Sequence, residues 1–144
     1  MSNYLDRIGA GWVLANPEVF NFDYVPDELV GREDVQNELA SKFTTLHLPE
    51  GSGRVVITGP VGSGKTALAQ TFCRDIQRHL SNKRNIRSVH VNCRNASTSM
   101  RVVQRILHEL APGHPDRGLS MGELLMSLRR ILRKETSHLI VVLD

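Results

Sequence analysis

The chain has 144 residues, 40% of them hydrophobic and 23% charged, with a formal net charge of +3 at pH 7. This length gives room for one domain with a sizeable core, and the mild positive charge permits contact with nucleic acid without requiring it. No apolar run approaches the roughly 20 residues of a membrane span, and the start of the chain lacks the pattern of a signal peptide, so we expect a cytosolic protein.

The first part of the chain has few regular signals. Residues 1–22 show no clear periodicity, and residues 22–29 form an apolar, turn-forming stretch. Apolar side chains then recur at helical spacing from 32 to about 46, which predicts a helix. A proline and two glycines predict a loop over 47–53.

A strand, a glycine loop and a helix are predicted next. Residues 54–58 are a short β-branched run that predicts a strand, and apolar residues spaced four apart predict a helix over 66–80. Between them the sequence fits the phosphate-binding loop, a glycine, four residues and then Gly-Lys-Ser/Thr. This loop consists of Gly59, Pro60, Val61, Gly62, Ser63, Gly64, Lys65 and Thr66.

The chemistry of this loop predicts a polyphosphate site. Glycines let the backbone curl so that several N–H groups point into one hollow, at the positive end of the helix that follows. Lys65 adds a mobile charge for the outer phosphates, and the Thr66 hydroxyl is a ligand for Mg²⁺. An ordinary glycine-rich turn is the alternative, but the flanking strand and helix favour the phosphate site.

The remaining elements alternate between strands and helices. A polar, basic loop over 81–87 precedes a predicted strand over 88–92, and apolar stripes predict helices over 100–110 and from Ser120 onward. A loop rich in proline and glycine separates the two helices. Glu123 lies three residues after Ser120, which predicts a capping box at the start of the second helix.

The last residues carry the second chemical signal. The wholly aliphatic run 139–143 predicts a parallel strand covered on both faces, and Asp144 follows it. Aliphatic residues followed by an acid are typical of the Walker B strand of phosphate-loop NTPases, whose carboxylate holds magnesium. Many ordinary strands also end in Asp, which can cap a helix. Given the loop, we predict Lys65 and Asp144 as catalytic groups and Thr66 and Asp144 as magnesium ligands.

Together these elements predict an α/β fold with a parallel sheet. Cys73 and Cys93 lack metal or redox spacing, so we expect free thiols. The histidines are not in a zinc spacing, so the only predicted metal is Mg²⁺ bound with a nucleotide. No candidate general base has a motif behind it, so the sequence favours nucleotide binding over turnover.

Several less common stretches point to one family. They are Asn16-Pro17-Glu18-Val19-Phe20, Tyr24-Val25-Pro26 with Leu29 and Arg32, and Val91-Asn92-Cys93-Arg94. With the phosphate loop, they make the chain resemble, over essentially its whole length, the archaeal origin-recognition replication initiators. These AAA+ ATPases are related to the eukaryotic origin recognition complex and its CDC-type loader. The resemblance implies the three-layer AAA+ P-loop NTPase fold, here truncated after the Walker B strand.

The resemblance also implies a cofactor, ATP or ADP with Mg²⁺. In AAA+ proteins the segment that matches Tyr24 to Arg32 wraps the adenine, and apolar contacts would be its physical basis. The alternative is that these residues dock the N-terminal segment on the sheet. The nucleotide-binding residues implied are Tyr24, Val25, Pro26, Arg32, Pro60, Val61, Gly62, Ser63, Gly64, Lys65, Thr66 and Ala67.

The implied function is that of a nucleotide-binding module of a replication initiator that binds origin DNA and helps to load the replicative helicase in the archaeal cytoplasm. Initiators insert a helical element that touches DNA, and it matches about 97–118 here. Arg101 and Arg105 are the implied DNA contacts, with an ordinary amphipathic helix as the alternative. Other possible functions are a nucleotide-latched signalling or scaffold ATPase that does not bind DNA, and a small-molecule kinase, for which no second substrate motif is visible.

The resemblance finally implies how the chain is divided. Residues 1–31 would be an N-terminal segment contacting the nucleotide site, and 32–144 a partial AAA+ core. Full-length initiators continue with two sensor motifs, an arginine finger, a helical lid and a winged-helix domain, and we expect ATPase activity only with them. The AAA+ strand order 5-1-4-3-2 places a fourth strand between the phosphate-loop strand and the Walker B strand. We therefore expect a gap, bare edges and possible self-association of this chain.

Overall fold

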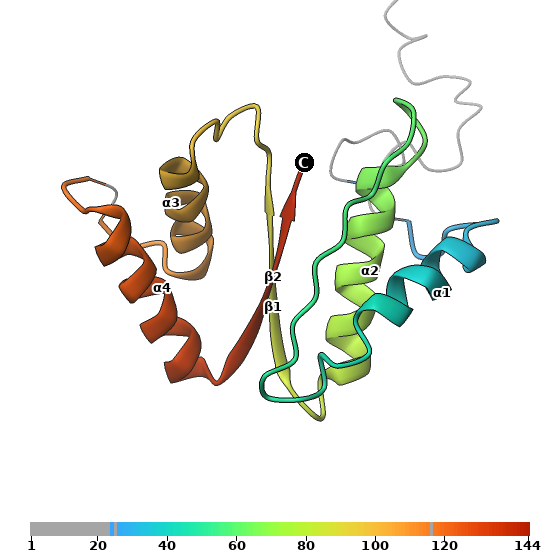
Figure 1. The fold of residues 1–144 in the computed structure, drawn as a ribbon, viewed down its shortest axis with the longest axis horizontal. Helices are drawn as coiled ribbons and strands as arrows, with labels where there is room; N and C mark the ends of the chain where they lie inside the picture. The colour runs from blue at the N-terminus through green and yellow to red at the C-terminus, as the bar shows by residue number, and fades with distance from the viewer. Residues whose placement is uncertain (1–23, 25, 116) are drawn as a thin grey trace, which may run out of the picture.

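The structure, a computed structural model, describes residue 24 and the ranges 26–115 and 117–144 (Figure 1). The helices and strands are α1 Glu33–Lys42, α2 Lys65–Leu80, β1 Asn85–Val91, α3 Ser99–Leu110, α4 Met121–Glu135 and β2 Ser137–Leu143. β1 and β2 form a parallel pair. α3 and α4 lie on one side of this sheet, and α2 lies on the other with α1 beside it (Figure 1). The predicted α/β class with a parallel sheet is confirmed.

The face of the sheet covered by α3 and α4 carries the largest buried cluster. Val89 and Val91 of β1 pack with Ile106 and Leu110 of α3, and partly buried residues of α4 close the cluster. Each fully buried aliphatic side chain contributes about 1.5–3 kcal/mol relative to exposure. Apolar side chains recur along α3 and α4 at helical spacing, so a stripe of each helix reaches the sheet. No helix in the described part of the chain is both long and apolar enough to span a bilayer.

Two helix starts are fixed by local side-chain contacts. The Ser120 hydroxyl accepts the N–H of Glu123, and the Glu123 carboxylate accepts the N–H of Ser120, which is the predicted capping box of α4. At α3, the Thr98 side chain accepts the N–H of Arg101. The Ser120–Glu123 box confirms the prediction made from residues three apart in the sequence, whereas the cap by Thr98 was not predicted.

The opposite face holds a smaller cluster of Leu46, Leu80 and Ile86. Leu46 reaches it because α1 ends at Lys42, whereas the sequence predicted a helix to about residue 46. The chain instead makes a turn in which the Leu46 N–H donates to the Phe43 carbonyl at 3.0 Å. The chain therefore leaves the helix after Lys42, and Leu46 packs against α2 instead of forming the last turn of the predicted helix.

Both strands begin earlier in the chain than the sequence predicted. β1 begins at Asn85 rather than at residue 88, and β2 begins at Ser137 rather than at 139. The added first residues of the two strands pair with each other, since Asn85 is opposite Ser137 in the parallel register. This pairing joins residues far apart in the chain, so local alternation of polar and apolar residues could not show it.

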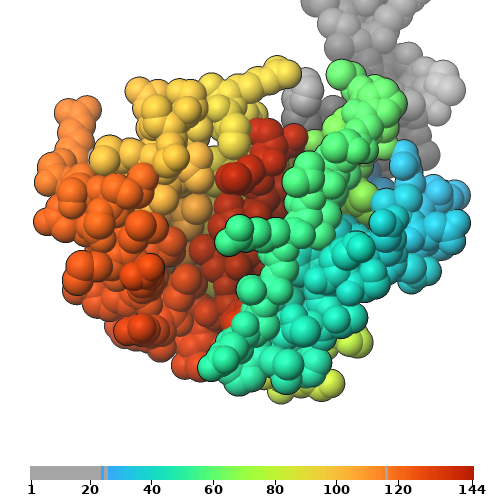
Figure 2. All heavy atoms as spheres, in the orientation of Figure 1, coloured from blue at the N-terminus to red at the C-terminus, as the bar shows by residue number. Residues whose placement is uncertain are grey.

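The predicted strand over 54–58 is wrong. Residues 51–60 form neither strand nor helix, because a strand requires a hydrogen-bonded neighbour and the described sheet contains β1 and β2 alone. The extended segment faces β2 across a groove of about 760 Å³ lined by Val55, Ile57, Leu139 and other residues. Figure 2 shows this segment in green beside the red atoms of β2.

β2 is consequently less covered than the sequence predicted. Its aliphatic run predicted burial on both faces, but Val141 is 36% and Leu143 is 60% exposed. The edge of β2 away from β1 faces the groove instead of another strand. The structure thus has the expected gap between the phosphate-loop segment and the strand that ends at Asp144.

Candidate nucleotide-binding site

The glycine loop leads directly into α2. Gly62 and Gly64 have φ angles of 78° and 82°, a left-handed conformation that only glycine adopts at little cost. Gly64 is the N-cap of α2, and the cap has no side-chain hydrogen bond. The first turn of α2 contains no acidic residue. Its N–H groups are therefore free of side-chain caps at the positive end of the helix, where an anion binds favourably.

Lys65 lies over this loop. Its ammonium group donates to the carbonyls of Gly59 at 3.0 Å and Pro60 at 2.7 Å, and lies 3.5 Å from the Ser63 hydroxyl. These acceptors all belong to the glycine loop itself. The ammonium group is thus positioned at the loop, where it can exchange carbonyl oxygens for phosphate oxygens.

Thr66 and Asp144 come together across 78 residues of chain. The Thr66 hydroxyl donates to Oδ2 of Asp144 at 2.7 Å. The backbone of Asp144 is fixed by β1, because its N–H donates to Val91 at 3.0 Å and its carbonyl accepts from Cys93 at 2.7 Å. The pair therefore joins the first turn of α2 to the end of β2, which the two sequence motifs together predicted.

The oxygens of Thr66 and Asp144 suit a hard cation such as Mg²⁺. Magnesium usually binds one or two protein oxygens together with phosphate oxygens and water. Within the described residues, no cluster of three or more His, Cys, Asp or Glu side chains could hold a metal alone. This donor set fits a cation that is bound together with a polyphosphate.

Arg32 also reaches the loop, from the start of α1. Its guanidinium donates to the carbonyl of Ser63, 31 residues away in the chain. It also lies near Gly64, where an added Cβ would be 3.9 Å from the Arg32 Nη2 atom. The sequence grouped Arg32 with the residues around the adenine, whereas the structure places it beside the phosphate loop.

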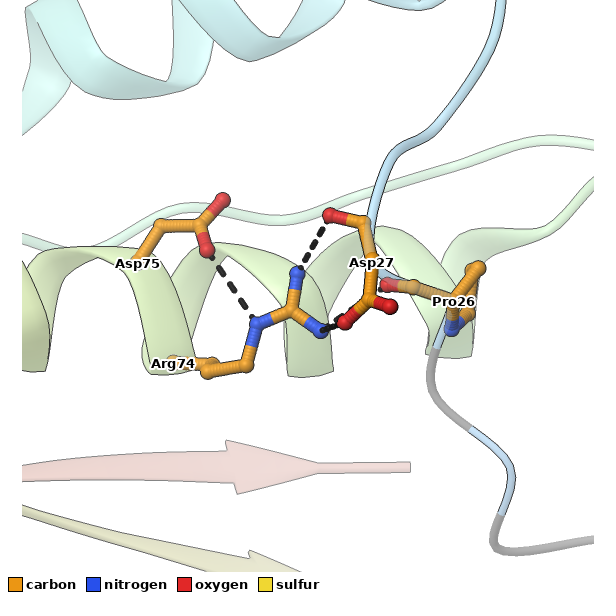
Figure 3. A network of polar contacts seen from close by, with 4 residues as sticks. All are labelled: Pro26, Asp27, Arg74 and Asp75. Atoms are coloured by element: carbon orange, nitrogen blue, oxygen red, sulfur yellow. Dashed lines mark hydrogen bonds and ion pairs between the residues drawn. The ribbon is translucent and has the colours of Figure 1, made fainter.

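Arg74 holds the chain before α1 against α2 (Figure 3). Its guanidinium donates to the carbonyls of Pro26 at 2.9 Å and Asp27 at 2.8 Å, and it lies 3.8 Å from the Asp27 carboxylate. Its Nε atom lies 3.2 Å from Asp75. Sequence reasoning missed this role of Arg74, since nothing in the sequence around it signals carbonyl partners 47 and 48 residues away.

Only part of the predicted adenine wall is described. Tyr24 is 36% exposed, Pro26 is half-buried, and Val25 lies outside the described residues. The contacts of Arg74 with Pro26 and Asp27 place the end of this segment on α2. Contact of these residues with a base remains a prediction.

The predicted DNA residues lie in a different layer. Arg101 and Arg105 are exposed on α3, on the opposite side of the sheet from α2 and the glycine loop (Figure 1). Arg105 forms an ion pair with Glu109 at 2.7 Å. The structure therefore brings Arg32, Lys65, Thr66 and Asp144 together but does not bring the α3 arginines to them.

Both cysteines are free thiols, as predicted. Cys73 lies in α2 with 6% exposure, and burial raises its pKa to about 11. A thiol with a raised pKa is a weak nucleophile and a poor metal ligand at neutral pH. Cys73 therefore belongs to the packing of α2.

Comparison with known proteins agrees with this geometry. A family model described as AAA ATPase domain matches residues 28–144. The ORC1-type DNA replication protein 2 of Sulfolobus acidocaldarius is 34% identical over 143 residues, covering 96% of this chain and 34% of that protein. The protein of the same name from Saccharolobus solfataricus is 32% identical over 136 residues, covering 92% and 33%.

Solved structures give the same result. The structure of the Aeropyrum pernix ORC1 protein in complex with DNA matches with a TM-score of 0.72 and 31% identity, covering 88% of this chain and 34% of that one. The Aeropyrum pernix ORC2 protein, in ADPNP-ADP complexes, matches with a TM-score of 0.78 and 26% identity, covering 90% and 35%. The chain thus spans about a third of the length of these relatives. The resemblance inferred from the sequence motifs is confirmed.

Proposed function

The chain belongs to the AAA ATPase domain family, and we propose that it is the ATP- or ADP-binding module of a DNA replication initiator. The observation that carries the proposal is the meeting of Thr66 and Asp144 at 2.7 Å beside an uncapped glycine loop. A phosphate loop and a distant carboxylate meet in this way where a nucleotide and its cation bind.

The loop amides and Lys65 bind the phosphates, with Arg32 close to the Ser63 carbonyl. Thr66 and Asp144 hold Mg²⁺, which neutralises phosphate charge when bound. The base would lie against the segment 24–26, which Arg74 ties to α2 at Pro26. The full set of proposed contacts is Tyr24, Val25, Pro26, Arg32 and the run from Pro60 to Ala67.

Substitution of Lys65 by alanine tests the phosphate assignment. A charge-assisted hydrogen bond contributes about 1.5–3 kcal/mol, so a titration with fluorescent ADP should show roughly ten- to hundredfold weaker binding. Lys83→Ala is the matched control, because Lys83 is exposed in the turn after α2. Equal affinity of the Lys65→Ala variant and the unmodified chain would refute the loop assignment.

The second part of the proposal is that the intact initiator contacts origin DNA through α3 and helps to load the replicative helicase in the archaeal cytoplasm. Its support is the exposed position of Arg101 and Arg105 on α3 and the similarity to the Aeropyrum pernix ORC1 protein, which was solved in complex with DNA. The alternative is a nucleotide-latched signalling or scaffold ATPase. The ion pair of Arg105 with Glu109 favours it, because that contact already uses one of the two cations.

A double substitution, Arg101→Ala with Arg105→Ala, distinguishes these two functions. In the full-length protein, loss of two phosphate contacts should reduce the dependence of log K on log salt by about 1.8, or 0.9 for each contact. Arg129→Ala with Arg133→Ala on α4 is the control, with the same spacing and exposed cations. If the DNA affinity and the salt slope of the Arg101→Ala, Arg105→Ala variant are unchanged, the result favours the scaffold ATPase over the DNA-binding initiator.

We also propose that residues 1–31 form a segment that contacts the nucleotide site and 32–144 form a partial AAA+ core. The contacts of Arg74 with Pro26 and Asp27, and of Arg32 with Ser63, support this division. The unpaired edge of β2 in the described sheet further supports self-association of this chain, because an edge strand without a partner can pair with another strand.

A further inference from the structure

His90 lies behind the carboxylate of Asp144 and belongs to neither sequence motif. It is in β1, opposite Val142 of β2 in the parallel register. Its Nε2 atom is 3.3 Å from Oδ2 of Asp144. This Nε2 atom is buried and has no hydrogen-bond partner of good geometry among the described residues.

Gln70 holds the other side of the same ring. It lies on α2, one turn after Thr66, and its amide nitrogen is 3.2 Å from Nδ1 of His90. An amide nitrogen only donates hydrogen bonds, so Nδ1 accepts and the ring carries a proton on Nε2. Gln70 thereby selects the tautomer whose N–H points toward Asp144.

The Nε2 N–H of His90 has a nearby acceptor in the Asp144 carboxylate. A buried donor without a partner is costly, and an oxygen of the Asp144 carboxylate lies 3.3 Å away without forming a hydrogen bond to it. The Asp144 side chain is 45% exposed and can otherwise turn toward solvent. A small rotation of the carboxylate toward His90 would satisfy the donor and limit the orientations of its oxygens, while Thr66 holds the carboxylate from α2.

We propose that His90 is a positioning residue that, set by Gln70, orients the Asp144 carboxylate toward Thr66 for binding of a magnesium–nucleotide complex. The inference rests on the proposed function, because it concerns the same two magnesium ligands. Partners behind a metal ligand fix its orientation, and their loss commonly weakens metal affinity about 10- to 100-fold. His90 would touch neither phosphate nor magnesium.

The test measures ADP affinity twice, in EDTA and in Mg²⁺, and takes the ratio of the two dissociation constants. His90→Phe keeps a ring in the same place but removes the N–H. Its affinity in EDTA should stay within about twofold, while the Mg²⁺ enhancement should fall about tenfold. His90→Asn, which retains a side-chain N–H, should recover part of the loss. Ser88→Ala is the control, because Ser88 lies two residues before His90 on the same strand face.

The outcomes separate the two proposals. An unchanged Mg²⁺ enhancement in His90→Phe overturns the positioning role and leaves the nucleotide site intact. Gln70→Leu gives a second test from α2 if His90→Phe does not fold, since loss of the enhancement supports the role and retention overturns it. Failure of the unmodified chain to bind ADP in either solution would overturn the proposed function and this inference together.

Discussion

Both faces of the sheet bury apolar side chains, but the α3–α4 layer and the glycine loop are held by different kinds of contact. Toward α3 and α4, the fully buried side chains include Val91, Leu107 and Leu124, so burial of apolar area fixes that face. Toward the glycine loop, Val56 is 86% exposed and Val61 is fully exposed. There, arginines and a lysine that donate to backbone carbonyls tie the segments together.

The two kinds of contact have different consequences for the free energy of unfolding and for ligand affinity. Apolar burial contributes to folding whether or not a ligand is present. Carbonyl acceptors of Lys65 can instead be exchanged for ligand oxygens at little cost, because one acceptor replaces another. We therefore expect substitutions on the α3–α4 face to change the free energy of unfolding most, and substitutions around the loop to change ligand affinity most.

The largest effect is expected for Leu124→Ala in α4, where the side chain is completely buried. Removing a buried leucine costs about 2–5 kcal/mol of unfolding free energy, measured by urea denaturation. Val56→Ala is the control on the glycine-loop side of the groove, where 86% exposure should limit the loss to about 0.5 kcal/mol. Equal losses of unfolding free energy in the two variants would contradict the proposed difference between the α3–α4 face and the glycine-loop side.

A smaller and more selective effect is expected for Arg74→Ala. Loss of the bonds to Pro26 and Asp27 should release the segment before α1 and weaken ADP binding roughly tenfold, about 1.4 kcal/mol. Affinity for tripolyphosphate, which has no base, should stay the same. Arg78→Ala, one turn further along α2 and exposed, serves as control. Equal weakening of both ligands would show that Arg74 acts on the loop and not on the base side.

The open edge of β2 gives a third prediction. Val141→Lys places a charge on the uncovered edge strand and should shift sedimentation of a concentrated sample toward the monomer. Met126→Lys, at a 68% exposed position of α4, should leave the distribution unchanged. If the unmodified chain is a monomer at every concentration, the self-association proposal is wrong.

The smallest effect concerns pH and the capping box of α4. Hydrogen bonds from the Ser120 backbone and side chain lower the pKa of Glu123 below its ordinary value of 4.5. The carboxylate form therefore contributes stability that is present above pH 4.5 and is lost as pH falls through the lowered pKa. Ser120→Ala should flatten this part of the stability curve in thermal melts, and Ser97→Ala should not. An unaltered stability curve in Ser120→Ala would show that the capping box does not contribute to the pH dependence of stability.

The parts that the sequence predicted correctly depend on neighbours along the chain. The capping box at Ser120 and the loop before Lys65 are set by residues a few positions apart. The strand over 54–58 failed because β-branched residues favour extension, whereas a strand also needs a partner that the described chain does not place there.

The contacts that sequence reasoning missed are long-range and polar. Arg74 binds carbonyls of Pro26 and Asp27, and carbonyls carry no sequence signal because every residue has one. His90 meets Asp144 only after β1 and β2 pair in their observed register. Thr66 and Asp144 were the exception, because each belongs to a motif whose chemistry implies the other.

The central claim is that the amides at the start of α2 capture a polyphosphate. Backbone amide chemical shifts, followed by NMR as magnesium–ADP is added, test it most directly. We expect the largest shifts at Gly62, Gly64 and Lys65, with little change along α4. Saturating nucleotide that leaves these amides unmoved, or that moves only residues elsewhere, would contradict it.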